Sequence, residues 1–161
     1  MLTQNAYRIV SAETGSDLTE IKKMFRAYVD WLDIDLTYQG FEEELAGLPG
    51  KYTEPSGALF LARNTSDEAL GCVGLRAMAG AGICEMKRLY VSPDGRGLGI
   101  GAALVNKVVS AARAAGYQRM RLDTLPTMTG AIKLYTKAGF TEIPAYYDTP
   151  IKETVFFEKR L

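Results

Sequence analysis

The chain has 161 residues, of which 47% are hydrophobic and 24% are charged, with 19 basic and 19 acidic side chains and no histidine. This length and composition predict one globular domain and exclude disordered and fibrous proteins. The balanced charge gives no global attraction to nucleic acids or membranes, and the lack of histidine excludes Ser-His-Asp and Cys-His nucleophile pairs, HExxH zinc sites and C2H2 fingers.

Hydrophobic spacing and turn residues predict strands and helices in a definite order. Helices are expected from near Asp17 to residue 32, where Asp17 and Glu20 resemble a capping box, and over residues 41–46, 98–115 and 129–137. Strands are expected over residues 7–10, 58–62, 69–78, 83–91, 120–125 and 154–159. Hairpins come first and strand–helix units follow, so the sequence predicts a single α/β domain with a mixed sheet.

Three features predict a cytoplasmic protein. No apolar run reaches the roughly 18–20 residues that span a bilayer, and the first residues show no basic segment followed by an apolar one. The two cysteines, Cys72 and Cys84, form neither a disulfide framework nor a metal site, and they suit a reducing compartment. We therefore expect no bound metal and neither membrane nor nucleic-acid partners.

Charged residues are unevenly distributed along the chain. Residues 11–55 carry ten acids against four bases, whereas residues 86–121 carry seven bases against Asp94 alone. Two interpretations remain open. The segments are solvated faces that happen to differ, or they form two sub-sites, one for a polyanion and one for a cation.

The sharpest local feature is a glycine-rich stretch, Arg96-Gly-Leu-Gly-Ile-Gly-Ala102, between a predicted strand and a predicted helix. Its three glycines let the backbone turn tightly and leave its N–H groups uncovered. A helix start has about four unpaired N–H groups and a partial positive charge, and Arg96 adds further donors. The stretch therefore predicts a site for a phosphate-bearing ligand.

The same glycines also fit a dinucleotide fingerprint. Gly97-x-Gly99-x-x-Ala102 has the required spacing, and Asp123 ends the next predicted strand at nearly the right distance. Only about 60 residues follow the glycines, however, which is too few to complete a doubly wound sheet. The spacing favours a phosphate site and disfavours a nicotinamide cofactor.

Three motifs follow one another in the second half of the chain: residues 85–91 (EMKRLYV), the glycine-rich stretch, and residues 134–140 (LYTKAGF). In this order they resemble the fourth strand, the R/Q-x-x-G-x-G/A loop and the L-Y-x-K-x-G-F motif of the GNAT superfamily of N-acetyltransferases. The resemblance implies one acetyltransferase domain over residues 1–161. Residues 1–55 would form its acceptor side and residues 83–140 its acetyl-CoA-binding core. It also implies a mostly antiparallel sheet, about four flanking helices, and a cofactor loop between the fourth strand and the third helix.

The resemblance implies transfer of an acetyl group from acetyl-CoA, a co-substrate, to a primary amine by direct attack in a ternary complex, with no metal. Backbone N–H groups of the loop would hold the pyrophosphate, the strand before it would pair with the pantetheine arm, and a strand N–H would polarise the thioester carbonyl. Lys137 would reach the outer phosphates, unless it is a solvated helix lysine. Met128 stands where the family often has asparagine. The expected cofactor-binding residues are Leu89, Tyr90, Val91, Arg96, Gly97, Leu98, Gly99, Ile100, Gly101, Ala102 and Lys137.

Two residues are expected to carry the catalysis. An alkyl amine is mostly protonated at pH 7, and a carboxylate that takes its proton contributes roughly 10²–10⁴ in rate. Glu85 is the expected base, and strand alternation places it opposite Met86 and Arg88 unless a bulge shifts the register. Tyr135 is the expected acid for the departing thiolate. Alternatively, Glu85 is only a structural ion-pair partner, and Tyr135 only packs in the core.

The acceptor is the least determined part. Tyr28, Trp31 and Tyr38 lie where the family lines its acceptor pocket, and core packing is their alternative. Tyr146 and Tyr147, before the last strand, are equally consistent with lining or packing. The acidic excess of residues 11–55 predicts a cationic acceptor, either a small amine or a basic peptide. A homodimer remains open, as does a non-catalytic CoA-binding sensor or interaction module.

Overall fold

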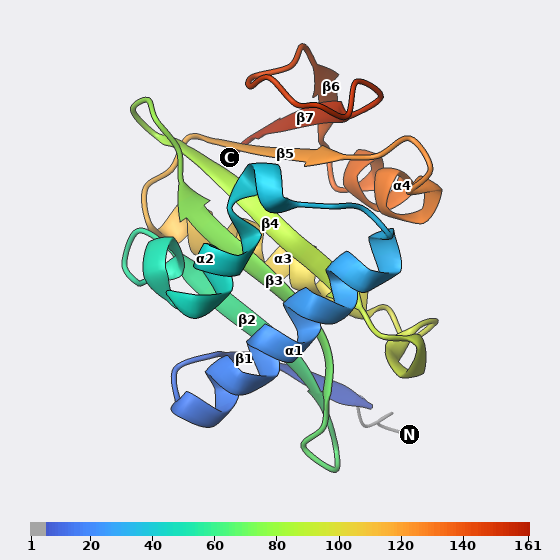
Figure 1. The fold of residues 1–161 in the computed structure, drawn as a ribbon. Coiled ribbons are helices and arrows are strands. Elements are labelled where there is room, and N and C mark those ends of the chain that lie inside the picture. The colour runs from blue at the N-terminus through green and yellow to red at the C-terminus, as the bar shows by residue number, and fades with distance from the viewer. Residues whose placement is uncertain (1–5) are drawn as a thin grey trace.

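Within residues 6–161, the part of the chain that this computed structural model describes, seven strands form one mixed sheet (Figure 1). The sheet order is β1-β2-β3-β4-β5-β7-β6, and the pairing of β4 with β5 is parallel whereas the other pairings are antiparallel. The predicted α/β class and mostly antiparallel sheet are therefore confirmed. The strands are β1 (Tyr7–Ser11), β2 (Ala58–Asn64), β3 (Ala69–Ala77), β4 (Ile83–Val91), β5 (Arg119–Thr124), β6 (Thr141–Ile143) and β7 (Val155–Arg160).

Four α-helices cover the two faces of the sheet in the described part (Figure 1). One buried cluster packs α3 and α4 against one face, and a second packs α1 and α2 against the other. The helices are α1 (Gly15–Leu32), α2 (Phe41–Ala46), α3 (Ile100–Ala114) and α4 (Thr129–Lys137), with short 3-10 turns η1 (Thr37–Gln39), η2 (Gly50–Tyr52) and η3 (Pro93–Gly95). Among residues 6–161, no helix combines the length and apolar character needed to cross a membrane.

The start of α1 differs from the prediction. Thr14 is the N-cap, and its side chain accepts a hydrogen bond from the backbone N–H of Asp17, whose carboxylate accepts one from the N–H of Thr14 in return. Asp17 thus closes a capping box as its third helical residue, and the expected pairing of Asp17 with Glu20 was wrong. Glu20 instead forms an ion pair with Lys23 at 3.4 Å.

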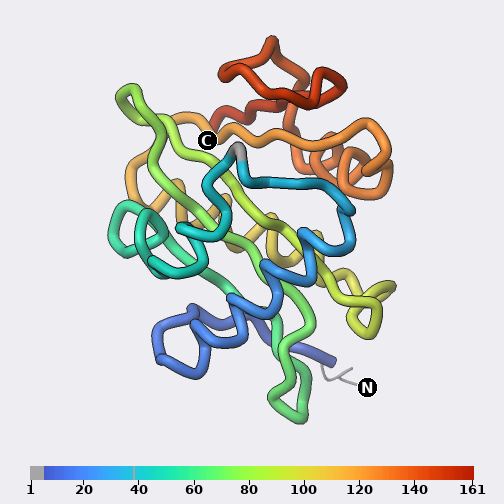
Figure 2. Tube along the Cα trace, viewed as in Figure 1, coloured from blue at the N-terminus to red at the C-terminus, as the bar shows by residue number. Residues whose placement is uncertain are grey.

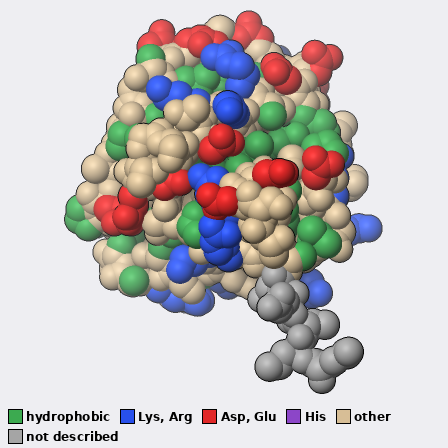
Figure 3. Space-filling view, turned by 90° about the horizontal axis from the view of Figure 1, so that it is seen from below, with side chains coloured by type: hydrophobic (Ala, Val, Ile, Leu, Met, Phe, Trp, Pro, Cys, Tyr) green, Lys and Arg blue, Asp and Glu red, His purple; other side chains and the backbone are tan. Residues whose placement is uncertain are grey.

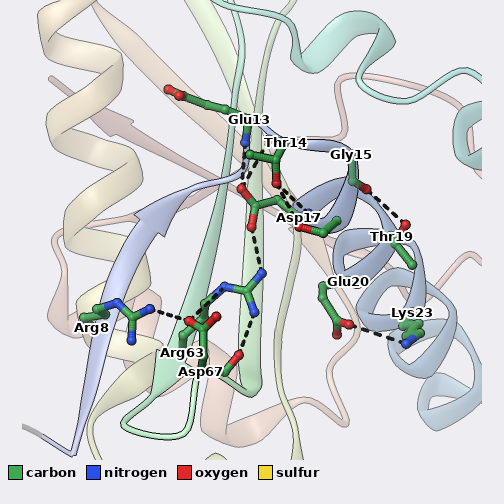
Figure 4. A network of polar contacts seen from close by, with 11 residues as sticks. Arg8, Glu13, Thr14, Gly15, Asp17, Thr19, Glu20, Lys23, Arg63 and Asp67 are labelled. Carbon is green, nitrogen blue, oxygen red and sulfur yellow. Dashed lines mark hydrogen bonds and ion pairs between the residues drawn. The ribbon is translucent and has the colours of Figure 1, made fainter.

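Asp17 also ties α1 to the sheet (Figure 4). Its Oδ1 accepts a hydrogen bond from Arg63 Nη2 of β2 at 2.7 Å, and its Oδ2 accepts from the backbone N–H groups of Glu13 and Thr14. Burial opposes ionisation of this carboxyl, but the hydrogen bonds outweigh it and lower the pKa of Asp17 to about 2.

We expect Asp17→Asn to remove a pH-dependent part of the folding stability. The folded-state pKa lies below the ordinary value of 3.8, so the stabilisation is present above that value and is lost as the pH falls toward 2. Discounted for a side chain that is 16% exposed, it amounts to about 1–2 kcal/mol. Urea unfolding at about pH 6 and at about pH 2.5 should show the gap between wild type and variant closing with acid. Glu13→Gln is the control, because it also removes an acid at this end of the helix. A difference in free energy of unfolding between wild type and Asp17→Asn that does not change with pH would contradict the prediction.

The sheet opens between β4 and β5, which run together at one end and separate toward α4 (Figure 1). Only Ile83–Glu85 of β4 pair with Arg119–Arg121 of β5 in the described part, and β5 then continues alongside β7 alone. The segment that follows α1, residues 33–37, crosses in front of this opening (Figure 2). Beyond Ile83–Glu85 and Arg119–Arg121, the facing edges of β4 and β5 are therefore not paired with each other in the described part.

A β-bulge interrupts β4 where the opening begins. The pairing with β3 shifts between Gly74↔Lys87 and Cys72↔Tyr90, and Arg88 takes a left-handed conformation with φ of 59°. The side chain of Arg88 consequently reaches Glu44 of α2, on the face that also carries Glu85 and Lys87. The expectation that Glu85 and Arg88 point to opposite faces was wrong because of this bulge, and Met86 does lie in the opposite core.

Candidate functional site

The glycine-rich stretch forms a loop that leads into α3. Gly97 and Gly99 both have φ of 79°, a left-handed conformation that strains any residue with a Cβ. α3 begins at Ile100, two residues later than predicted, because Gly99 is its left-handed N-cap. A Cβ on Gly97 would meet nothing within 4 Å, so the space beside the loop is open. The N–H groups of the first helical turn thus form a cradle that fits a phosphate group.

An apolar groove runs from this loop toward the opening in the sheet. Trp31 of α1 is 48% exposed at its rim, with the Arg96 guanidinium 5.4 Å from the centre of its ring. The structure therefore places Trp31 beside the loop, whereas it was expected to line the acceptor pocket. The groove is lined by Trp31, Leu89, Tyr90, Val91, Arg96, Gly101, Met128, Gly130, Ala131 and Leu134. Five of the eleven expected cofactor-binding residues thus share one surface, which suits an extended, largely apolar arm.

An inner pocket lies in the opening between β4 and β5. It shares Leu89 and Met128 with the apolar groove, so the two adjoin. Its lining comprises Tyr28, Leu32, Ile34, Leu36, Gln39, Met86, Lys87, Arg88, Leu89, Leu122, Asp123, Thr124, Leu125, Met128, Tyr135, Ile151 and Thr154. The bulge in β4 and the carboxyl end of β5 thus face each other across this pocket.

Tyr135 stands at the wall of the inner pocket. Its ring is buried and packs edge-on against Phe140, with the ring centres 5.9 Å apart. Burial raises the pKa of the phenol well above its ordinary value, so the hydroxyl stays protonated at neutral pH. The ring of Tyr135 thus packs in the core while the residue also lines the pocket, and its role as an acid stays a prediction.

Glu85 lies in a different space. It lines an outer cavity that opens beside β3 and the segment before β7, and it is not among the residues that line the inner pocket. Its Oε1 accepts hydrogen bonds from Arg76, whose Nε and Nη2 lie 2.9 and 2.8 Å away, and its Oε2 accepts one from Tyr146 at 2.6 Å. The outer cavity is lined by Gln39, Lys51, Arg76, Ala77, Met78, Ala79, Glu85, Lys87, Tyr146, Tyr147 and Asp148.

Lys87 and Gln39 line both spaces and Asp123 lines the inner pocket, and sequence reasoning assigned neither Lys87 nor Asp123 a role in catalysis. Lys87 Nζ donates to Gln39 Oε1 at 3.2 Å and lies 3.7 Å from Asp123 Oδ1. Burial lowers the pKa of Lys87, although the charges of Asp123 and Glu85 oppose the shift. Tyr147 donates a hydrogen bond to Asp123 Oδ2. The alternation of β4 could have placed Lys87 on the face of Glu85, but only the fold brings β5 beside it.

The remaining predicted residues fall at different places. Tyr28 lines the inner pocket, with its ring centre 6.1 Å from that of Tyr90. Lys137 is exposed in the last turn of α4. The side chain of Tyr38 lies outside the described residues. Tyr146 both lines the outer cavity and packs against Phe156, with ring centres 4.9 Å apart.

Ion pairs account for part of the uneven charge. In residues 11–55, Asp17, Glu20, Glu42 and Glu44 all have basic partners. In residues 86–121, Lys87, Arg88, Arg119 and Arg121 have acidic ones. Figure 3 likewise shows basic and acidic side chains interspersed on the face that it draws. Part of the charge of both segments is thus paired within the protein.

Comparisons with known proteins point to one family. The model of the Acetyltransferase (GNAT) family matches residues 19–140. An uncharacterised N-acetyltransferase from Schizosaccharomyces pombe is 38% identical over 156 residues, which cover 97% of this chain and 96% of that protein. A solved structure from Klebsiella pneumoniae, assigned as an acyl-CoA N-acyltransferase, has a TM-score of 0.77 and 28% identity, covering 98% of this chain and 99% of that one.

A third similarity concerns the fold alone. N-acetylglutamate synthase from Neisseria gonorrhoeae, solved with coenzyme A and N-acetylglutamate, matches with a TM-score of 0.67 and 19% identity. The match covers 99% of this chain and 36% of that longer chain. That protein thus holds coenzyme A on a fold of this kind.

Proposed function

Because this chain belongs to the GNAT family of acetyltransferases, we propose that it moves an acetyl group from acetyl-CoA to a primary amine by direct attack in a ternary complex. The observation that carries the proposal is the order of three adjoining features. The glycine loop at the start of α3 borders an apolar groove, and the groove adjoins a pocket at the bulge of β4. These features match in order the pyrophosphate, the pantetheine arm and the thioester of acetyl-CoA, which supplies the acetyl group.

The loop and β4 would bind this donor through their backbones. N–H groups from Gly97 to Ala102 would hold the pyrophosphate, and Arg96 would add charge at the rim. The N–H of Leu89 or Tyr90, turned by the bulge at Arg88, would polarise the thioester carbonyl. Trp31 would cover the arm from the side of α1, which is why we assign it to donor binding.

Glu85 would act on the acceptor's ammonium group before the attack, and Tyr135 would act on the sulfur that departs after it. Glu85 lies in the outer cavity, where an ammonium group arriving from solvent would lose its proton. Tyr135 keeps its proton because of its raised pKa, so it would donate a hydrogen bond to the departing sulfur inside the pocket. The supporting observation is that each residue lines the space in which its step would take place.

Calorimetric titration with acetyl-CoA and with NADH tests the donor. We expect micromolar binding of acetyl-CoA. Binding of NADH without binding of acetyl-CoA would contradict the proposal and revive the dinucleotide interpretation of the glycines. A protein that binds acetyl-CoA but acetylates none of a broad set of amines, amino acids and peptides would support the alternative, a non-catalytic CoA-binding module.

We expect Glu85→Gln to lower kcat at least about tenfold and Tyr135→Phe to lower it somewhat less. Glutamine keeps the shape of Glu85 but cannot take a proton, whereas phenylalanine keeps the ring packing of Tyr135 and loses only the hydroxyl. Steady-state release of free thiol measures both effects, and the melting temperature checks that the variants fold. Unchanged turnover in both variants would leave these roles without support.

The acceptor's charge stays a prediction. The acids that predicted a cationic acceptor are in part paired within the protein, and the outer cavity carries side chains of both signs. The amine screen should therefore contain matched cationic and anionic acceptors at low and high salt. A higher kcat/KM for the cationic amine, weakened by salt, supports the prediction, and a preference for the anionic amine contradicts it.

A further inference from the structure

Two protons leave the acceptor's nitrogen during acetyl transfer to an ammonium ion, and Glu85 accounts for one. The ammonium loses the first proton before its nitrogen attacks. After the nitrogen–carbon bond forms, the nitrogen loses a second proton while the carbon–sulfur bond breaks and the thiolate gains a proton. This second transfer takes place at the reacting atoms, inside the inner pocket, where Glu85 has no surface.

Among the residues that the structure describes, Asp123 supplies the carboxylate of the inner pocket. It lies on β5 just beyond the last residues that pair with β4, and its side chain is 13% exposed. The same pocket is lined by Arg88 and Leu89 of the bulge and by Tyr135 of α4. Asp123 therefore faces the backbone that would hold the thioester carbonyl, and it does so from the opposite strand.

Within the described part of the chain, Asp123 accepts a hydrogen bond through one of its two carboxylate oxygens. Tyr147 donates to Oδ2, and Lys87 Nζ is 3.7 Å from Oδ1, beyond the usual length of a hydrogen bond. Tyr147 thus fixes the carboxylate while Oδ1 retains room to accept a proton. Both oxygens of Glu85, in contrast, already accept hydrogen bonds from Arg76 and Tyr146.

We propose that Asp123 is a second catalytic carboxylate, which takes the second proton from the acceptor's nitrogen through Oδ1. The proton taken up by Asp123 then passes to the departing sulfur, while Tyr135 keeps its own proton and donates a hydrogen bond to that sulfur, so that the carboxylate returns to its starting state. Lys87 and Tyr147 act as positioning residues for Asp123. The inference rests on the proposed acetyltransferase function and adds a catalytic group to it.

Two acceptors with the same carbon skeleton separate the roles of the two carboxylates. Ethylamine is mostly charged at pH 7, whereas 2,2,2-trifluoroethylamine is mostly uncharged and needs no first deprotonation. Each variant is compared with wild type on the same amine by thiol release from acetyl-CoA. We expect Asp123→Asn to lower kcat about a hundredfold on both amines. We expect Glu85→Gln to lower it on ethylamine and to change it less than about threefold on trifluoroethylamine.

Further variants separate catalysis from folding. Asp123→Asn leaves the buried Lys87 without its acidic partner, so the double variant Asp123→Asn/Lys87→Met removes both charges together. We expect the double variant to melt within a few degrees of wild type and to stay inactive. Asp123→Glu should recover at least about tenfold over Asp123→Asn. Glu153→Gln, an exposed residue in the loop before β7, is the matched control and should keep wild-type kcat.

The outcomes distinguish a failure of the role proposed for Asp123 from a failure of the proposed acetyltransferase function. Wild-type kcat in Asp123→Asn on both amines overturns the inference and leaves the acetyltransferase proposal standing. Recovered turnover in the double variant also overturns it, because Asp123 would then serve only to pair Lys87. If wild type acetylates neither probe nor any amine of the screen, the proposed function itself fails.

Discussion

Glu44→Ala is expected to lower the free energy of unfolding by about 3–5 kcal/mol, which corresponds to a melting temperature roughly 10 °C lower. Glu44 is 12% exposed and accepts hydrogen bonds from Arg88 Nε at 3.1 Å and from Tyr52 Oη at 3.0 Å. Its removal leaves Arg88, whose side chain is 3% exposed, as an uncompensated buried charge. Thermal and urea unfolding measure the loss directly.

A neighbouring residue supplies the control for this prediction. Glu43 lies on the same helix but is exposed, so Glu43→Ala should change stability by no more than about 0.5 kcal/mol. Replacing both members of the pair, in Glu44→Leu/Arg88→Met, should recover much of the stability because no buried charge remains. Equal losses from Glu43→Ala and Glu44→Ala would show that the pair with Arg88 is not the cause.

We expect Gly99→Val to weaken binding of acetyl-CoA about a hundredfold. Gly99 has φ of 79°, which costs any L-residue about 1–2 kcal/mol and a β-branched one more. The new side chain would also stand beside the N–H groups at the start of α3 that we assign to the pyrophosphate. Fluorescence of Trp31, the single tryptophan of the chain, reports the binding because the residue lies beside Arg96 at the groove.

Gly116→Val is the matched control for backbone strain. Gly116 follows α3 with φ of 89°, and a Cβ there would meet nothing within 4 Å. The two variants should therefore lose similar stability, but only Gly99→Val should lose affinity for acetyl-CoA. Similar affinities in the two variants would show that the loop does not contact the donor.

Local patterns in the sequence predicted most of the elements, because spacing and turn residues act over a few neighbours. α2 and α4 have the predicted bounds, and the loop before α3 lies where its glycines indicated. β6 was not predicted, since three residues with two exposed side chains give almost no alternation. The capping box was misplaced because Thr14 and Asp17 offer the same pattern as Asp17 and Glu20.

The candidate site depends on contacts between distant parts of the chain, which the sequence could not give. The partners of Glu85 come from β3 and from the loop before β7, and Tyr146 is 61 residues away. Asp123 matched a dinucleotide fingerprint, and only the separation of β4 from β5 brings it to the inner pocket. The conformation of Arg88 results from a register shift between strands, which no feature of residues 85–91 reveals.

The bulge at Arg88 also limits how this protein can be re-engineered. Arg88 shares its bulge with the backbone assigned to the thioester, and its side chain is neutralised by α2, in the segment expected to select the acceptor. Residues 1–55 therefore cannot be exchanged for the same segment of a relative without regard to the rest of the chain. A chimera that imports this segment from a relative needs an acid in the place of Glu44, or else an uncharged residue in the place of Arg88. Libraries that aim to change the acceptor should hold this pair fixed and vary the outer cavity instead.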